Sequence, residues 1–289
     1  MRILVLGGRG MLGHKVWEIL SNSMDVYATI RGSFDDLEEL GSFDKNKIIS
    51  GIDALDFSLL ERKIEELSPD VVLNCIGIVK QIEDAEDAIK SIEINSLFPH
   101  RLSSLCARIN SRLMHLSTDC VFSGKKGNYT ETDTSDPVDL YGRTKLLGEV
   151  QEGNVLTIRT SMIGRELKTQ HGLLAWFLNQ EGKTVEGYSK AIFSGFPTVV
   201  LSKIIKDIIL NYPGLKGIYH VSSLPISKFD LLTLIKRKMG LDINIIKNTK
   251  VFCDRSLNHS KFSWECNYNP PSWEIMVDEL VYEMRGDKI

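Results

Sequence analysis

The segment LVLGGRGMLGHKV, residues 4–16, decides the fold of this chain. Apolar residues run up to Gly7, and helical spacing of apolar residues follows, so a glycine-rich turn joins a strand to a helix. Gly8, Gly10 and Gly13 have the G-x-G-x-x-G spacing. Such a turn lets the backbone approach a pyrophosphate closely, and the N–H groups at the start of the helix favour an anion. We therefore expect a dinucleotide to bind here.

Strand and helix patterns alternate through about the first 160 residues. Short apolar runs are separated by amphipathic helical segments, an order typical of a parallel sheet covered by helices on both faces. We predict an α/β fold with a doubly wound parallel sheet, the NAD(P)-binding Rossmann fold. The predicted strands are 2–6, 24–30, 70–77, 112–117 and 154–160, and the predicted helices are 11–21, 57–67, about 86–110 and the one that carries Tyr141.

Beyond residue 160 the alternation loosens, and helical segments are predicted at 171–180, 229–240 and 273–284. One further helix and strand, TVVLSKIIKDIIL and GIYHVSS, fit the main sheet. We predict a dinucleotide-binding domain at 1–160, to which 196–223 returns. The rest, mainly 161–289, is expected to form a smaller, interleaved C-terminal substrate domain.

The composition limits the class of protein. With 289 residues, 43% hydrophobic and 25% charged, the chain is typical of soluble globular proteins, and a net charge of -3 gives no case for nucleic acid. No apolar run approaches the roughly 20 residues that span a bilayer, so no membrane association is expected. The five cysteines lack CxxC spacing and the six histidines lack ligand spacing, which favours reduced thiols, no metal and a cytoplasmic location.

Two arginines bear on the choice of dinucleotide. Arg31 follows the second predicted strand, where NAD-specific proteins carry an acid for the ribose 2′-hydroxyl. Arg9 lies inside the glycine turn. Two guanidinium groups could pair with a 2′-phosphate in bidentate geometry, which favours NADPH. As solvated loop arginines they would leave NADH open.

Two further stretches combine hydroxyl and titratable residues. HLSTDC places Thr118 and Asp119 at the end of a predicted strand, where ligands of parallel sheets bind, although such residues also cap turns. In YGRTK, Tyr141 and Lys145 are four apart and share a helix face. Such a pair is ordinary on a solvated helix, but with the glycine turn and HLSTDC it forms a candidate active site.

These stretches resemble the extended short-chain dehydrogenase/reductases and, within them, the dTDP-4-dehydrorhamnose reductase family. The combination of STD-x-VF-x-G with YG-x-TK-x-x-GE is far more specific than either piece. The matching stretches run over nearly the whole chain in the family's order: GGRGMLG, DVVLNCIG, INSLFPHRLSSLC, HLSTDCVFSG, YTETDTSDPVDLYGRTKLLGE, LTIRTS and, more loosely, DRSLNHSKF.

The resemblance implies reduction by NADPH of the C4 ketone of a nucleotide-linked 4-keto-6-deoxy sugar, in deoxysugar and cell-surface polysaccharide biosynthesis. Tyr141 would protonate the alkoxide that hydride transfer creates, with the pKa of its phenol lowered by the Lys145 cation. Lys145 would also hold the nicotinamide ribose. Thr118 would donate a hydrogen bond to the carbonyl oxygen, where negative charge develops.

Two sets of binding residues follow from the turn and the resemblance. Asp56 and Phe57 match positions near the adenine, and Asn95 matches an asparagine that orders the site. The substrate-binding set is Thr118, Asp119, Cys120, Met162 and Arg255, of which Arg255 either approaches the diphosphate or makes a surface ion pair. The cofactor-binding set is Gly7, Arg9, Gly10, Met11, Leu12, Gly13, Arg31, Asp56, Phe57, Cys75, Ile76, Gly77, Asn95, Tyr141 and Lys145.

Two positions depart from the family pattern. Cys120 stands where tyrosine is usual, and Met162 stands where a tryptophan that contacts substrate is common. Either the pocket takes a bulkier sugar, such as a UDP-linked 4-keto-6-deoxy-N-acetylhexosamine, or other residues fill the space. Cys120 itself is expected to be a small buried thiol rather than a nucleophile.

Other functions fit parts of the pattern. Sugar-nucleotide epimerases and dehydratases use the same tyrosine and lysine, but dehydratases need a second acid where Cys120 follows Asp119. A non-catalytic regulatory subunit similar to the methionine adenosyltransferase beta subunit would bind the dinucleotide without turnover. The oligomeric state stays open, with a homodimer as the form considered.

Overall fold

The computed structural model describes residues 1–33, 44–79, 86–167 and 170–286, which form two compact units. The first unit contains Met1–Ser117, Asp139–Ile158 and Ser202–Ile218. The second contains Thr118–Val138, Arg159–Leu201 and Tyr219–Ile289.

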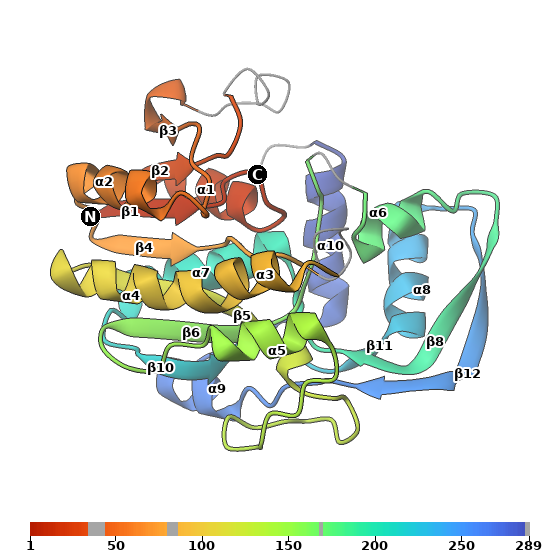
Figure 1. The fold of residues 1–289 in the computed structure, drawn as a ribbon. Helices are drawn as coiled ribbons and strands as arrows, with labels where there is room; N and C mark the ends of the chain where they lie inside the picture. The colour runs from red at the N-terminus through yellow and green to blue at the C-terminus, as the bar shows by residue number, and fades with distance from the viewer. Residues whose placement is uncertain (34–43, 80–85, 168–169, 287–289) are drawn as a thin grey trace. The chain divides into compact units, whose positions relative to one another are not determined.

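A seven-stranded sheet, counted over the described residues, has the order β10-β6-β5-β4-β1-β2-β3 (Figure 1). β1 pairs in parallel with β2 and β4, and further parallel pairs join β2 to β3 and β4 to β5. This order confirms the predicted doubly wound sheet. Its strands are β1 (Arg2–Leu6), β2 (Asp25–Thr29), β3 (Ile48–Ile49), β4 (Val71–Asn74), β5 (Arg112–Thr118), β6 (Val155–Thr160) and β10 (Gly217–His220).

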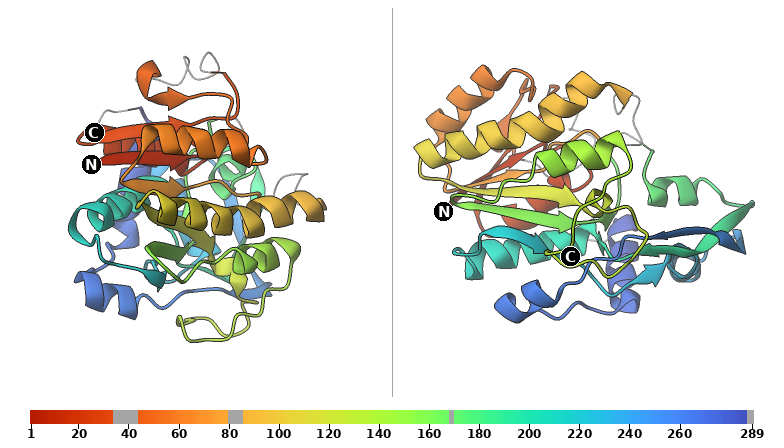
Figure 2. Two further views of the ribbon diagram at one scale, coloured as in Figure 1. Left: turned by 60° about the vertical axis from the view of Figure 1, so that its left-hand side comes forward. Right: turned by 60° about the horizontal axis from the view of Figure 1, so that its bottom comes forward.

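Helices cover both faces of this sheet (Figures 1 and 2). Strand order reverses between β1 and β4, and right-handed crossovers then place α1 (Gly13–Ser21) on one face and α2 (Phe57–Leu67) on the other. On the second face, Leu60 of α2 packs with Leu102 of α4 (Phe98–Arg108) against Val72 and Leu113 of the strands. α5 (Leu140–Leu147) and most of α7 (Thr198–Asn211) complete the first unit.

The helix predicted over 86–110 is three consecutive segments. α3 (Ala88–Ser91) leads into η4, a π-helical segment at Ile92–Leu97, and then into α4. Pro99 lies in the first turn of α4, directly after the π-helical segment. The helical stretch predicted over about 86–110 is therefore present, but it widens into a π-helical turn where the buried Asn95 and Ser96 turn inward.

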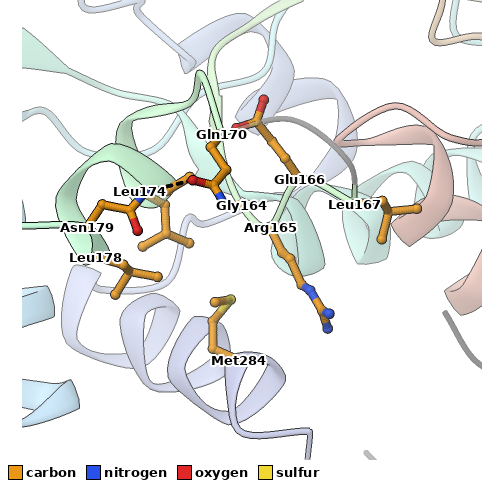
Figure 3. Close-up of a pocket in the computed structure, with 10 residues that line it drawn as sticks. Gly164, Arg165, Glu166, Leu167, Gln170, Leu174, Leu178, Asn179 and Met284 are labelled. Atoms are coloured by element: carbon orange, nitrogen blue, oxygen red, sulfur yellow. Dashed lines mark hydrogen bonds between the residues drawn. The ribbon is translucent and has the colours of Figure 1, made fainter. Parts of the chain in front are cut away.

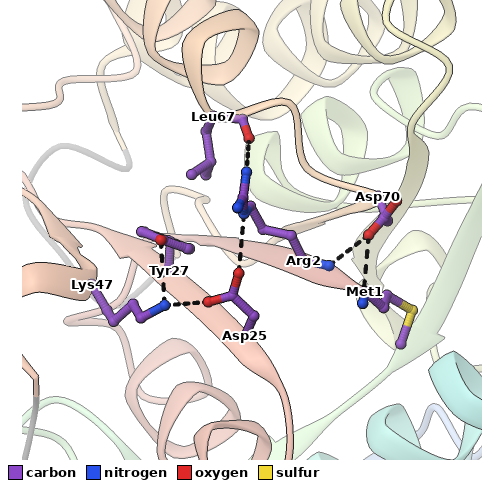
Figure 4. Close-up of polar contacts among 7 residues, drawn as sticks. All are labelled: Met1, Arg2, Asp25, Tyr27, Lys47, Leu67 and Asp70. Carbon is purple, nitrogen blue, oxygen red and sulfur yellow. Dashed lines mark hydrogen bonds and ion pairs between the residues drawn. The ribbon is translucent and has the colours of Figure 1, made fainter.

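Charged side chains contact one another at the end of the sheet where its strands begin (Figure 4). Arg2 Nε donates to Asp25 Oδ2 at 3.1 Å, and Arg2 Nη1 donates to the carbonyl oxygen of Leu67 at 2.8 Å. Lys47 forms an ion pair with Asp25 and donates to the Tyr27 hydroxyl at 3.3 Å. The hydrogen bond from Lys47 and the nearby Arg2 lower the pKa of the Asp25 carboxyl. These contacts link β1, β2 and α2 at the amino-terminal ends of the strands.

The second unit has its own sheets. β8 (Thr184–Phe193) lies between β11 (Ile226–Ser227), its antiparallel neighbour, and β12 (Asn244–Asp254), its parallel neighbour. A short parallel pair joins β7 (Met162–Ile163) and β9 (Phe196–Pro197). The helices at 173–178, 228–239 and 273–284 match the helical segments predicted at 171–180, 229–240 and 273–284, with α8 beginning one residue earlier, whereas β8 and β12 were not predicted. The helices of this unit are α6 (Leu173–Leu178), α8 (Lys228–Met239), α9 (Ser260–Cys266) and α10 (Trp273–Met284).

The described residues contain neither a helix that could cross a membrane nor a cluster of metal-ligand side chains. No described helix combines the length and apolarity that a bilayer crossing needs. No three histidine, cysteine or acidic side chains in the described ranges gather as metal ligands would. All five cysteines lie in described segments and are free thiols.

Candidate active site

The glycine turn has the geometry that a dinucleotide requires. Gly7 has a positive φ of 82°, which disfavours any residue with a side chain. The Gly10 N–H donates to the Gly7 carbonyl oxygen at 2.9 Å, and a Cβ on Gly13 would lie 2.1 Å from that oxygen. α1 begins at Gly13 with no side-chain cap at Leu12 and no acid in its first turn. A tight turn before a helix start without a side-chain cap or acid fits a pyrophosphate.

The loop after β4 lies beside this turn. Leu6 and Asn74 are partners in the β1–β4 ladder, and the Cys75 N–H donates to the Leu6 carbonyl oxygen at 3.1 Å. A Cβ on Gly7 would lie 3.1 Å from Cγ1 of Ile76. The structure therefore brings the predicted stretch Cys75–Gly77 next to the glycine turn, at the point where strand order reverses and ligands of such sheets bind. Burial raises the pKa of the Cys75 thiol to about 12, so this thiol is protonated.

Four other predicted cofactor residues are placed by local contacts. Arg31 is exposed just beyond β2, and Arg9 is half-buried in the turn. Asp56 caps α2, because its side chain accepts from the Leu59 N–H at 3.1 Å. Phe57 packs edge-on against Phe98, with 6.0 Å between ring centroids. Contact of these residues with an adenosine stays a prediction.

The helix α5 presents the predicted tyrosine and lysine. Asp139 accepts from the Gly142 N–H at 2.7 Å and so fixes the start of the helix just before Tyr141. Tyr141 and Lys145 are therefore on one face, one turn apart. Lys145 is only 4% exposed, and its Nζ donates to the Leu116 carbonyl oxygen at 2.6 Å. Burial lowers the pKa of Lys145 to about 8.

η4 holds α5 in place. Asn95 Oδ1 accepts from the Ile78 N–H at 2.9 Å, while its Nδ2 donates to the Ile78 carbonyl oxygen at 2.9 Å and to Thr144 Oγ1 at 3.2 Å. A Cβ on Gly148 would lie 1.9 Å from the Asn95 carbonyl oxygen, so only glycine permits this approach. Asn95 thus links the loop after β4 to the helix that carries Lys145.

The second unit holds the predicted substrate residues that follow β5. Thr118 Oγ1 accepts from the Cys120 N–H at 3.1 Å and donates to Asp119 Oδ1 at 3.2 Å, so the hydroxyl caps the short helix η5 (Asp119–Val121). Cys120 is a buried free thiol, as expected. Half-buried Arg255 donates from Nε to the Phe122 carbonyl oxygen at 2.8 Å and from Nη1 to Cys120 Sγ at 3.6 Å. The structure thus brings Arg255 to the segment after Thr118.

A pocket of about 240 Å³ lies in the second unit after β7, the strand that begins with Met162 (Figure 3). Asn179 Nδ2 donates to Gln170 Oε1 at 2.8 Å on one wall. Glu166 Oε2 accepts from the Gly172 N–H at 2.7 Å. Arg165, Glu166 and Gln170 thus line this pocket together with apolar side chains of α6 and α10, of which Leu174, Leu178 and Met284 are labelled.

Sequence reasoning missed two residues beside Lys145. Asn74, the last residue of β4, is the register partner of His115 in the middle of β5, and both are fully buried. Asn74 Nδ2 lies 3.1 Å from His115 Nδ1, and His115 Nε2 lies 3.5 Å from Lys145 Nζ. The available signal was a single polar residue within each of two apolar strand patterns, VVLN and LMHL.

The chain matches the family model described as RmlD substrate binding domain over residues 1–284. A dTDP-4-dehydrorhamnose reductase of Burkholderia thailandensis is 32% identical over 56% of this chain and 50% of that protein, so the alignment spans only half of that relative's length. The enzyme of that name from Aggregatibacter actinomycetemcomitans is 28% identical over 81% of this chain and 78% of its own.

Two further comparisons bear on fold and function. Methionine adenosyltransferase 2 subunit beta of Mus musculus is 29% identical over 53% of this chain and 44% of that protein. The crystal structure of dTDP-4-dehydrorhamnose reductase from Bacillus anthracis in complex with NADP superposes with a TM-score of 0.79, at 20% identity, over 98% of this chain and 99% of that one. The second comparison supports the same fold.

Proposed function

Because this chain belongs to the RmlD substrate binding domain family, we propose that it is an NADPH-dependent reductase of the C4 ketone of a nucleotide-linked 4-keto-6-deoxy sugar. Tyr141 and Lys145 on one face of α5, with Lys145 buried and anchored to Leu116, carry the proposal. The reaction would serve deoxysugar and polysaccharide synthesis. Five free thiols agree with a reducing, cytoplasmic setting.

The proposed cofactor site lies in the first unit. The turn at Gly7–Gly13 would receive the pyrophosphate, Cys75–Gly77 would line the cofactor, and Lys145 would hold the nicotinamide ribose. Arg9 and Arg31 supply the cationic groups that a 2′-phosphate needs, which favours NADPH over NADH. A bound NADPH supplies the hydride that the ketone carbon receives.

The chain's own residues complete the reduction. Tyr141 gives its phenolic proton to the oxygen of the reduced carbon, and the Lys145 ammonium stabilises the phenolate that remains. The Thr118 hydroxyl, which donates to Asp119 at 3.2 Å, would turn its O–H to the carbonyl oxygen and stabilise the developing charge there. Its Oγ1 can continue to accept from the Cys120 N–H during this change.

The second unit would bind the sugar nucleotide. Cys120 and Met162 provide less aromatic surface than the family pattern, which favours space for an N-acetyl group. A UDP-linked 4-keto-6-deoxy-N-acetylhexosamine is therefore the second candidate substrate. The hydrogen bonds from Arg255 to Phe122 and Cys120 hold its guanidinium at the segment proposed to face the substrate. We propose that this guanidinium binds the diphosphate.

The test follows NADPH absorbance with purified protein and two substrates, the dTDP-linked 4-keto-6-deoxyhexose and the UDP-linked N-acetylhexosamine. Oxidation with one of them establishes the reductase and identifies the sugar. Similarity to the methionine adenosyltransferase beta subunit over about half the chain motivates the competing regulatory function. Tight NADPH binding without oxidation of either substrate would favour that function.

Tyr141→Phe tests the proton donor directly. General acid catalysis contributes about 10²–10⁴-fold, so kcat should fall by that factor while NADPH affinity stays near the wild-type value. Tyr27→Phe is the matched control, because it keeps the ring and removes a hydroxyl that accepts a hydrogen bond from Lys47 at the opposite end of the sheet. Undiminished turnover in Tyr141→Phe would remove this residue from the mechanism.

A further inference from the structure

Three buried side chains, Asn74 of β4, His115 of β5 and Lys145 of α5, lie next to one another beside the proposed catalytic helix α5. Asn74 and His115 are neighbours in the β4–β5 ladder, so their side chains lie on the same face of the sheet. Both have no solvent exposure, and Lys145 has 4%. Asn74 Nδ2 lies 3.1 Å from His115 Nδ1. On the other side of the imidazole ring, His115 Nε2 lies 3.5 Å from Lys145 Nζ.

The backbone fixes the orientation of the Asn74 amide. The Ile76 N–H donates to Asn74 Oδ1 at 3.0 Å, so the amide oxygen faces Ile76 and the NH₂ group faces His115. Rotating the amide by half a turn would place its NH₂ against the Ile76 N–H. His115 Nδ1 is therefore a hydrogen-bond acceptor, and a neutral ring must carry its proton on Nε2.

This tautomer points an N–H at Lys145. A neutral amine can accept that hydrogen bond through its lone pair, whereas an ammonium group has only donors to offer. The lysine already donates to the Leu116 carbonyl oxygen at 2.6 Å. The imidazole therefore favours the neutral form of the lysine.

Other titratable groups near His115 and Lys145 are His100, Glu149 and Cys75. Burial, with Lys145 and His100 nearby, keeps the pKa of His115 well below its ordinary value, so the ring is neutral at physiological pH. Glu149, whose carboxylate accepts from Ser117 at 2.6 Å, acts in the opposite direction on Lys145 and favours its charged form, while the nearby Cys75 is a protonated, uncharged thiol. Tyr141 shares the helix face with Lys145.

We propose that Asn74 and His115 are positioning residues for the proposed catalytic lysine: Asn74 fixes the ring tautomer, and the His115 Nε2–H lowers the proton affinity of Lys145. This inference rests on the proposed reductase function. Once Tyr141 has protonated the product oxygen, an N–H bond of the Lys145 ammonium breaks and the phenol O–H bond forms again. A lysine that holds its proton weakly makes this transfer easier.

The tautomer is measured on the full-length wild-type protein labelled with ¹⁵N-histidine, with no substrate present. The ring signals of His115 are assigned by their loss in His115→Phe. We expect a neutral ring protonated on Nε2 from about pH 6 to about pH 9. A ring protonated on Nδ1, or one that titrates within this range, overturns the proposal.

Asn74→Asp tests the consequence for Lys145. The new carboxylate keeps the hydrogen bond from Ile76 and accepts a second one from His115 Nδ1–H, so Nε2 becomes an acceptor that favours the ammonium. The Lys145 titration, followed by ¹³C-lysine NMR and assigned with Lys145→Met, should shift upward by about 1–3 pH units. The alkaline limb of kcat/KM should shift with it.

Asn154→Asp makes the same charge change at an exposed residue of the same unit and should leave both titrations in place. An unshifted Lys145 titration in folded Asn74→Asp overturns the proposal, and if this variant does not fold, the wild-type tautomer decides. Neither NMR readout needs turnover. Absence of NADPH oxidation with both sugars therefore refutes the proposed function alone.

Discussion

Replacing Gly13 by alanine is the sharpest test of the glycine turn. Gly13 is the first residue of α1, and a Cβ there would lie 2.1 Å from the Gly7 carbonyl oxygen and 2.9 Å from the Gly7 carbonyl carbon. Carbon–oxygen contacts of this kind stay above about 3 Å, so the turn and the helix must separate by about 1 Å. Both colliding groups belong to the backbone, and no side chain can swing aside.

The expected magnitude follows from two opposing effects. Forcing an extra methyl group into a packed site costs about 1–3 kcal/mol, and a rigid backbone neighbour puts this case at the upper end. Alanine is favoured over glycine inside a helix by about 1 kcal/mol. Gly13→Ala should therefore lower the free energy of unfolding by about 2 kcal/mol. A shift of the turn by this amount should also weaken NADPH binding at least about tenfold.

Gly10→Ala is the matched control within the same turn. Gly10 is exposed, and a Cβ there would lie 3.3 Å from the Gly7 carbonyl oxygen, a tight contact that a small movement relieves. Its unfolding free energy should stay within about 0.5 kcal/mol of wild type. Urea unfolding gives the stability and titration calorimetry gives the NADPH affinity. Wild-type values of both for Gly13→Ala would refute the close-approach argument, and a loss of stability with intact NADPH binding would place the cofactor elsewhere.

Two further predictions concern charge. Arg31→Ala should raise the Kd for NADPH about tenfold while leaving NADH affinity unchanged, and equal effects on the two cofactors would show that Arg31 does not bind a 2′-phosphate. The lowered pKa of Asp25 means that its ion pairs stabilise the fold above the unfolded-state pKa of about 4 and lose this effect as pH falls through the folded-state value. Asp25→Asn should reduce the unfolding free energy at pH 7 by about 0.2–1 kcal/mol, and a difference that persists at about pH 2 would contradict the ion-pair explanation.

The doubly wound sheet could be predicted because its signals are local. Each predicted strand of this sheet is an apolar run with a clear end, and the glycine turn identifies the first crossover, whereas the two-residue strand β3 was too short to predict. β12 gives no such signal, since most of its side chains are exposed and its apolar residues do not alternate with polar ones, and only its pairing with β8, some 60 residues away, makes it a strand. The π-helical turn at η4 was not predicted either, because the inward turn of Asn95 is stabilised by contacts with the loop after β4 and with α5.

The candidate site also contains residues that local sequence identifies and residues that only the fold brings together. The glycine turn, Tyr141 and Lys145 have fixed spacings within one segment, so sequence could identify them and the structure then adds their burial and contacts. Asn74 and His115 are 41 residues apart, and only the β4–β5 register places them together. For Asp56 and Thr118 the structure adds capping hydrogen bonds, a local role that their residue types also predict.

The burial of Asn74 and His115 is itself informative about Lys145. Burying an amide and an imidazole costs several kcal/mol of desolvation, which hydrogen bonds only partly recover, and apolar residues would fill these strand ends at lower cost. The neighbouring Val72 and Leu113, two residues earlier on the same face, show what packing alone selects. A buried polar pair in which the His115 Nε2–H faces a lysine, rather than solvent or backbone, is best explained by what it does to that lysine. The fold then contributes to the proposed chemistry through the register of two strands, not only through the residues that would touch the substrate.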